Sequence, residues 1–146
     1  MFKMNFKKII PDTLIVLTIF LMDRIFKIYI LKIAELEEKV DIYINSFLNF
    51  YLIWNKGIAF GLLSFDKIII YQLISLIIFT ISVVLIFMII KSEGLKKYSL
   101  ISILGGALGN LFDRIYYSAV PDFIDLHFNG FHWFIFNLAD IFITIG

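Results

Sequence analysis

A run of 23 residues without a charge, 68–90, constrains this chain more than any other feature. At about 1.5 Å per residue, a helix of that length crosses a hydrocarbon core of ~30 Å. Apolar residues make up 61% of the 146-residue chain, against about 45–50% in an ordinary soluble domain. We therefore expect one membrane-embedded domain, 1–146, and no separate soluble domain.

Three further apolar segments accompany this run, which predicts an all-α polytopic membrane protein with four transmembrane helices. The expected spans are at about 10–30, 68–90, 98–116 and 131–146. The first span has Pro11 and Asp12 in its first turn, where both are favourable. Asp23 and Arg24 follow its apolar part where a signal-peptide cleavage site would need small residues, so we interpret it as a retained helix.

The segment between the first two spans has a different pattern. From Ile42 to Trp54 apolar residues recur with a period close to two, and many are aromatic or β-branched. Asn55-Lys56-Gly57 then forms a turn signal. The pattern favours a small extracytoplasmic β-cradle at about 40–66, and an irregular interfacial loop remains the competing interpretation.

Charge distribution predicts the orientation of the chain. Lysines gather before the first span and directly after the second, at positions Lys3, Lys7, Lys8, Lys91, Lys96 and Lys97. By the positive-inside rule both regions are cytoplasmic, so the N-terminus is expected inside. The chain has no cysteine, which excludes disulfides, thiolate metal sites and a thiol nucleophile.

Polar residues crowd the second half of this apolar sequence. Ionisable groups at membrane depth are costly and are functional candidates by default. The residues in question are Asn110, Asp113, Arg114, Asp122, Asn137 and Asp140. Gly105 and Gly109 form a GxxxG pattern beside them, which permits close approach of another helix.

Asp23 and Lys27 lie four residues apart and share a helix face. Two interpretations stay open: a simple ion pair with Lys27, or a brace for a site on other helices.

Asp122 and Asp140 are the strongest chemical candidates. Two carboxylates that face each other in a low-dielectric pocket share a proton, because both cannot ionise cheaply. Such a pair activates water and donates to a carbonyl oxygen, as in aspartic proteases, without a metal. An ion pair with Arg114 is the plainer alternative for any one aspartate, and Asp113 is the weakest catalytic candidate.

Two other classes of function remain open. The acids and Arg114 would suit an ion or proton relay in a transporter. Alternatively, acids would hold Mg²⁺ in a metal-dependent lipid phosphotransferase, with Asp113, Asp122, Asp125 and Asp140 as ligands. We interpret Asp125 as a solvated loop charge and His127 and His132 as interfacial loop residues.

Five segments, in order along the chain, resemble the motifs of the lipoprotein signal peptidase (signal peptidase II) family. They are MDRIFK, WNKGIAFG, GGALGNLFDRI, VPDFID and FNLADIFITIG. The resemblance implies an aspartyl endopeptidase with Asp122 and Asp140 as its catalytic dyad. It assigns substrate-binding or dyad-supporting roles to Asp23, Lys27, Asn55, Gly57, Asn110, Asp113, Arg114 and Asn137.

The same resemblance implies a location, a substrate and an inhibitor. Members lie in the bacterial cytoplasmic (inner) membrane among its lipids, with the active site toward the extracytoplasmic face. They cut diacylglyceryl-modified prolipoproteins on the N-terminal side of the lipidated cysteine, and the cyclic peptide globomycin inhibits them. We expect no metal, no other cofactor and no nucleic acid, and we expect the protein to be a monomer.

The C-terminal end departs from the family pattern. A helix from Phe131 to Gly146 would be about 24 Å long, short of a full span. Either the chain is truncated, or the fourth helix is short and the bilayer adjusts to it.

Overall fold

The computed structural model describes residues 6–57 and 67–146. Within these residues, helices and strands follow one another in the order α1 (Phe6–Glu37), β1 (Asp41–Asn45), β2 (Leu48–Asn55), α2 (Lys67–Lys91), α3 (Gly94–Tyr117), β3 (Val120–Phe128), β4 (Phe131–His132) and α4 (Leu138–Ile145). The strands form one antiparallel sheet in the order β1-β2-β3-β4.

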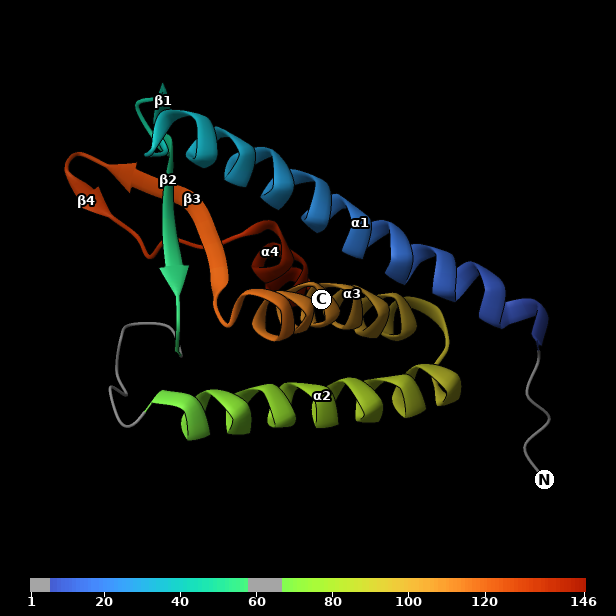
Figure 1. Ribbon diagram of the computed structural model, residues 1–146. Helices are drawn as coiled ribbons and strands as arrows, with labels where there is room; N and C mark the ends of the chain where they lie inside the picture. The colour runs from blue at the N-terminus through green and yellow to red at the C-terminus, as the bar shows by residue number, and fades with distance from the viewer. Residues whose placement is uncertain (1–5, 58–66) are drawn as a thin grey trace.

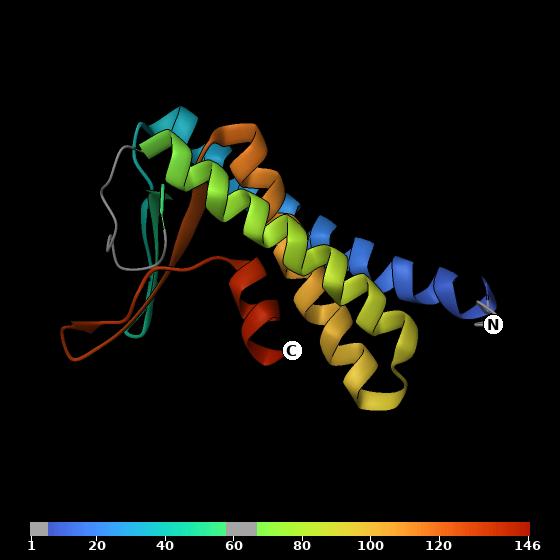
Figure 2. The same cartoon turned by 90° about the horizontal axis from the view of Figure 1, so that it is seen from below.

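Helix α3 is the centre of the packing, because α1, α2 and α4 all pack against it. Figure 1 shows the sheet at one end of α1, α2 and α3, with the N-terminus and the α2–α3 turn at the other end. Figure 2 shows the short α4 beside α3. Asn110 and Asp113 of α3 therefore lie between α1 and α4.

Glycines on α3 permit this close packing. A Cβ added at Gly105 would lie 2.7 Å from Cγ2 of Ile19 on α1, and one at Gly109 would lie 2.7 Å from Oδ2 of Asp23. A Cβ on Gly106 would overlap the carbonyl oxygen of Ala139 on α4. The GxxxG pattern thus faces α1, and Gly106 between its glycines receives α4.

Helix α2 has the surface expected of a helix in lipid. Its segment Tyr71–Lys91 is the one stretch of the described residues long and apolar enough to cross a membrane by length and composition. Only 17% of its most apolar window is buried, whereas the core helix of a soluble protein would be mostly covered. The helices α1 and α3 carry several charges, so the same criterion does not identify four spans.

The expected helix positions are close to those observed, with one exception. Helices α1, α2 and α3 include the predicted spans 10–30, 68–90 and 98–116. The fourth prediction is wrong at its start, because α4 begins at Leu138 and not at Phe131. Residues before Leu138 are extended: Phe131 and His132 form β4, and Phe136 forms an isolated bridge with Ile124.

The sheet is larger than the sequence indicated. Strands β1 and β2 confirm strand structure in the first part of the predicted β region, whose residues 58–66 lie outside the described part of the chain. The sequence did not predict β3, which pairs with β2 along most of its length, with Asn55 opposite Val120 and Ile53 opposite Asp122. The strand after α3 thus closes the cradle over the helices.

We expect Gly106→Ala to destabilise the fold by about 2 kcal/mol, since the added methyl must push α4 away from α3. Denaturant titration of the detergent-solubilised protein measures the loss. Gly57→Ala is the matched control, because a methyl there meets nothing within 4 Å. Equal stability of the two variants would contradict the close α3–α4 contact.

Candidate active site

Asp122 lies on β3 with 2% of its surface exposed. Its Oδ1 accepts a hydrogen bond of 2.6 Å from the Asn137 side chain, and its Oδ2 accepts one of 3.0 Å from Asn55. Asn55 ends β2 and is held in turn by the backbone N–H of Gly57, which donates to its Oδ1 at 3.1 Å. Both carboxylate oxygens are therefore fixed by amide donors.

Asp140 lies in the first turn of α4. Its Oδ1 accepts from Asn110 Nδ2 at 2.8 Å, and its Oδ2 accepts from the backbone N–H of Asn137 at 3.1 Å. The Asn137 side chain caps the helix by accepting from the Asp140 N–H at 3.1 Å, which completes a capping box. Asp140 is thus at the mouth of a short helix and not two turns inside a long one.

A short backbone connection brings the two acids together. The N–H groups of Phe123 and Ile124 both donate to the Phe136 carbonyl, at 3.0 and 2.7 Å, and Phe136 N–H donates back to Ile124 at 3.1 Å. This pairing holds Asn137 beside β3, where its amide reaches Asp122 while its oxygen caps α4. Asn137 therefore bridges both acids.

The pKa of Asp122 differs from that of an exposed aspartate. Burial raises the pKa of Asp122, and the negative charge of Asp140 raises it further. Two hydrogen bonds, from Asn137 and Asn55, and the positive charge of Lys27 oppose this rise and lower the pKa. The result is a pKa of about 6 for Asp122, so this carboxyl takes up a proton at mildly acidic pH.

A second group of charged residues lies behind the acids. Lys27 is fully buried, and its Nζ donates to Asp23 at 2.8 Å, to Asp113 at 2.6 Å and to Asn110 Oδ1 at 3.1 Å. Asp23 also accepts from the Ala139 N–H at 3.0 Å, directly before Asp140. Both interpretations of Asp23 hold geometrically, since it pairs with Lys27 and also braces α4.

Arg24 is a member of this group that the sequence analysis did not assign to the site. Its Nη2 lies 2.5 Å from Asp113 Oδ1 and 3.3 Å from Asp23 Oδ2, and its guanidinium lies over the Phe112 ring. The available signal was a second cation in an apolar helix, three residues before Lys27. Two cations thus balance Asp23 and Asp113, which leaves Asp113 occupied by ion pairs.

Arg114 lies apart from the two acids. Its Nη1 donates to the Asn110 carbonyl at 3.3 Å, and among the described residues it forms no ion pair with an aspartate. It lines a cavity of about 460 Å³ between α2 and α3, together with Lys56, Tyr71 and Gln72. The structure therefore gives the plainer interpretation of the acids, an ion pair with Arg114, no support.

An apolar groove of about 520 Å³ leads to Asp140. Its walls come from the β1–β2 turn, the β3–β4 hairpin and α4, and include Phe47, Phe128, Trp133 and Ile141. Two carboxyl groups beside an apolar groove suit a substrate that is largely apolar and has one reactive amide bond.

Comparison with known proteins agrees with this geometry. The family model described as Signal peptidase (SPase) II matches residues 15–146. The lipoprotein signal peptidase of Pelagibacter ubique (strain HTCC1062) is 57% identical over 144 residues, covering 99% of this chain and 87% of the relative. That of Anaplasma phagocytophilum (strain HZ) is 37% identical over 143 residues, covering 96% and 88%.

Solved structures are similar as well. One described as a bacterial membrane enzyme at 1.9 Å resolution superposes with a TM-score of 0.77 at 30% identity, covering 99% of this chain and 91% of that one. Another, at 2.3 Å resolution, gives a TM-score of 0.75 at 30% identity and covers 99% and 86%.

The raised pKa of Asp122 predicts a pH-dependent stability. Because the folded pKa of about 6 exceeds the ordinary 3.8, the folded chain binds more proton than the unfolded chain between these values. The stabilisation is present below about pH 4 and is lost as the pH rises through about 6, worth up to about 3 kcal/mol.

Thermal unfolding across this pH range in detergent measures the effect. Asp122→Asn should flatten that slope, whereas Asp41→Asn, which removes an exposed carboxylate on β1, should leave it close to wild type. An Asp122→Asn slope equal to wild type would contradict the raised pKa.

Removal of Lys27 should be costly, because Lys27→Met leaves two buried carboxylates short of a cation. We expect a loss of about 3–5 kcal/mol in the free energy of unfolding, measured by denaturant titration. Lys39→Met is the matched control, since it breaks the exposed Lys39–Asp41 pair and should change stability little. Similar losses in both variants would show that Lys27 is not the principal counter-charge.

Proposed function

The chain belongs to the signal peptidase II family, and from that membership we propose that it removes the signal peptides of lipoproteins in a bacterial membrane. The observation that carries the chemical part of the proposal is the pair Asp122 and Asp140, joined by Asn137 at the end of an apolar groove. Their environment supports an aspartic mechanism, in which the two acids form the catalytic dyad.

In this mechanism the dyad shares one proton. Because the pKa of Asp122 is raised to about 6, we assign the proton to Asp122 and the base to Asp140. Asp140 takes a proton from a water whose oxygen attacks the scissile carbonyl, while Asp122 donates to the carbonyl oxygen. The C–N bond then breaks as the amide nitrogen receives a proton from the dyad.

The surrounding residues position the dyad. Asn55 and Asn137 orient Asp122, and Asn110 orients Asp140. Asn110 is itself held by Lys27, whose charge is balanced by Asp23 and Asp113. We therefore assign Asp23, Lys27 and Asp113 to positioning, Gly57 to fixing Asn55, and Arg114 to the neighbouring cavity.

The groove suits a lipidated substrate. Its apolar walls offer binding to the acyl chains or the apolar signal segment of a diacylglyceryl prolipoprotein. Binding energy from these remote parts positions the scissile bond, on the N-terminal side of the lipidated cysteine, against the dyad. We expect globomycin-type cyclic peptides to compete for this groove, and the enzyme to work as a monomer.

The arrangement of charges supports a multi-pass orientation in the inner membrane. The start of α1 and the α2–α3 turn lie at the end opposite the sheet (Figure 1). Lys97 of α3 pairs with Asp12 of α1 at this end. The positive-inside rule assigns this end to the cytoplasm. The dyad and sheet then face the extracytoplasmic side, with α1, α2, α3 and the short α4 in the bilayer.

The two rival functions find less support. A relay would need polar groups along a path through the bilayer, but the acids gather near the sheet end. A Mg²⁺-dependent phosphotransferase would need converging acids, whereas Asp113 is occupied by Lys27 and Arg24 and Asp125 contacts histidines. Peptide hydrolysis accounts for the pair Asp122–Asp140 directly.

Cleavage of a diacylglyceryl prolipoprotein in detergent tests the dyad. Asp122→Asn and Asp140→Asn should each lower the rate by at least about 10³-fold, because each removes a proton-transfer group. Asp41→Asn is the matched control and should retain wild-type cleavage. Excess EDTA should leave the wild-type rate within about twofold, since proton transfer by carboxyl groups needs no metal.

Retention of membrane insertion and of the folded thermal transition distinguishes lost chemistry from lost folding. Near-normal cleavage by either dyad variant would end the assignment, and loss of cleavage in EDTA that Mg²⁺ restores would favour the Mg²⁺-dependent mechanism.

A further inference from the structure

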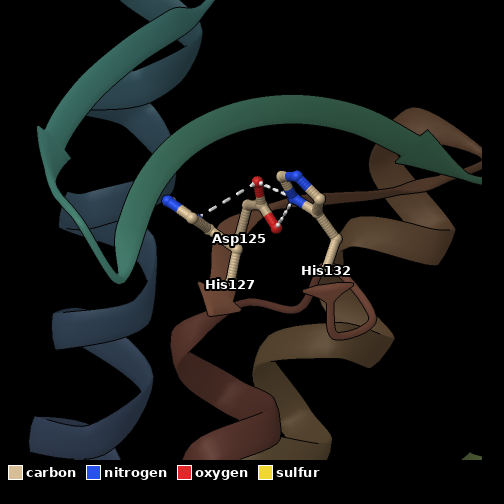
Figure 3. Close-up of side chains that lie close together, drawn as sticks. All are labelled: Asp125, His127 and His132. Atoms are coloured by element: carbon tan, nitrogen blue, oxygen red, sulfur yellow. Dashed lines mark hydrogen bonds and ion pairs between the residues drawn. The ribbon is translucent and has the colours of Figure 1, made fainter. Parts of the chain in front are cut away.

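Asp125, His127 and His132 form a compact cluster on the β3–β4 hairpin, outside the dyad (Figure 3). The sequence analysis interpreted Asp125 as a solvated loop charge, and that interpretation is wrong: its side chain is 7% exposed. One ligand atom from each of the three residues lies within 4.8 Å of the other two. The hairpin thus collects two imidazoles and a carboxylate at one point.

The hairpin geometry explains the convergence. His127 and His132 are directly opposite in the β3–β4 register, and their rings stack with centroids 5.1 Å apart. Asp125 lies two residues before His127 and so projects from the same face of β3. The turn between the strands uses Asn129 and Gly130, both with positive φ.

Asp125 lacks a strong counter-charge. Its oxygens lie 3.1 and 2.9 Å from His132 Nδ1, and its Oδ2 lies 3.9 Å from His127 Nδ1. Among the described residues no lysine or arginine pairs with it. A buried carboxylate is costly unless a cation neutralises it.

His127 has a buried nitrogen that lacks a hydrogen-bond partner. Its Nδ1 is inaccessible to solvent and has no hydrogen-bond partner. This nitrogen lies 3.9 Å from Oδ2 of Asp125, the carboxylate that itself needs a cation, and Figure 3 marks the contact with a dashed line. A metal ion between them would satisfy both groups at once.

We propose that Asp125, His127 and His132 bind one Zn²⁺ ion that fastens β4 to β3. Two imidazole nitrogens and a carboxylate oxygen are a ligand set that zinc accepts, with water in a fourth position, whereas Mg²⁺ and Ca²⁺ prefer oxygen alone. Two ligand atoms at about 2.0–2.1 Å from zinc can lie at most about 4.2 Å apart, so the cluster, whose ligand atoms lie within 4.8 Å of one another, has to tighten slightly. His132 can move to do so, because its side chain is 56% exposed.

The site has a structural consequence near the groove. His127 also lines the groove that reaches Asp140, and Phe128, Phe131 and Trp133 of the same hairpin form its wall. β4 has only two residues and little pairing of its own to hold that wall. Bound zinc would therefore stiffen one side of the groove without touching the dyad, and the inference does not rest on the proposed peptidase activity.

Zinc titration of the full chain in detergent tests this site. The protein carries no polyhistidine tag and is first stripped with EDTA. Isothermal titration calorimetry should give one Zn²⁺ per chain. Zinc should raise the unfolding temperature, and Mg²⁺ should not.

Variants identify the ligands. His132→Ala and Asp125→Asn should each weaken zinc binding by at least about tenfold, and Asp41→Asn should bind like wild type. His132 is exposed, so its variant should fold, and near-ultraviolet circular dichroism verifies this. Wild-type affinity in both ligand variants, or no zinc-dependent rise in unfolding temperature, would overturn the proposal.

Discussion

The buried ammonium of Lys27 is the interaction on which the site depends. It contacts Asp23 of its own helix and Asn110 and Asp113 of α3, and Asp23 in turn accepts a hydrogen bond from the Ala139 N–H in the first turn of α4. The ammonium of Lys27 thus connects α1 to α3 directly and to α4 through Asp23. A lone buried ion would cost several kcal/mol, so Arg24 and the two carboxylates complete a balanced set that makes burial tolerable.

Charge balance separates the acids into two kinds. Asp23 and Asp113 have cations at hydrogen-bond distance and act as fixed counter-charges. Asp122 and Asp140 have amide donors instead, which orient a carboxylate without neutralising it. Burial and the negative charge of Asp140 then outweigh the hydrogen bonds from Asn137 and Asn55 and the charge of Lys27, and the pKa of Asp122 rises to about 6. The proposed division between supporting and catalytic acids therefore follows from the partners of each carboxylate, not from the residue type.

The sequence predicted the long helices and the polar residues of the site, because charge-free runs and ions in apolar surroundings are local signals. It did not predict β3, because the partner strand β2 lies far away in the sequence. It also placed the fourth helix too early: the aromatic run before Asn137 is apolar enough for a span, but Phe136 pairs with β3. The Asn137–Asp140 capping box, readable as an N-cap signal, marks the true start.

Strand β3 carries two buried aspartates, and the geometry of the strand gives them different neighbours. Asp122 and Asp125 are three residues apart, so the alternation of a strand directs them to opposite faces. One face meets Asn137 and the α4 N-terminus, where a proton can be shared with Asp140. The other face meets the histidines of the hairpin, so the neighbours of Asp125 are imidazole nitrogens and not a second carboxylate. A single strand therefore supplies one carboxyl to the proposed dyad and one carboxyl to the proposed zinc site, on opposite faces.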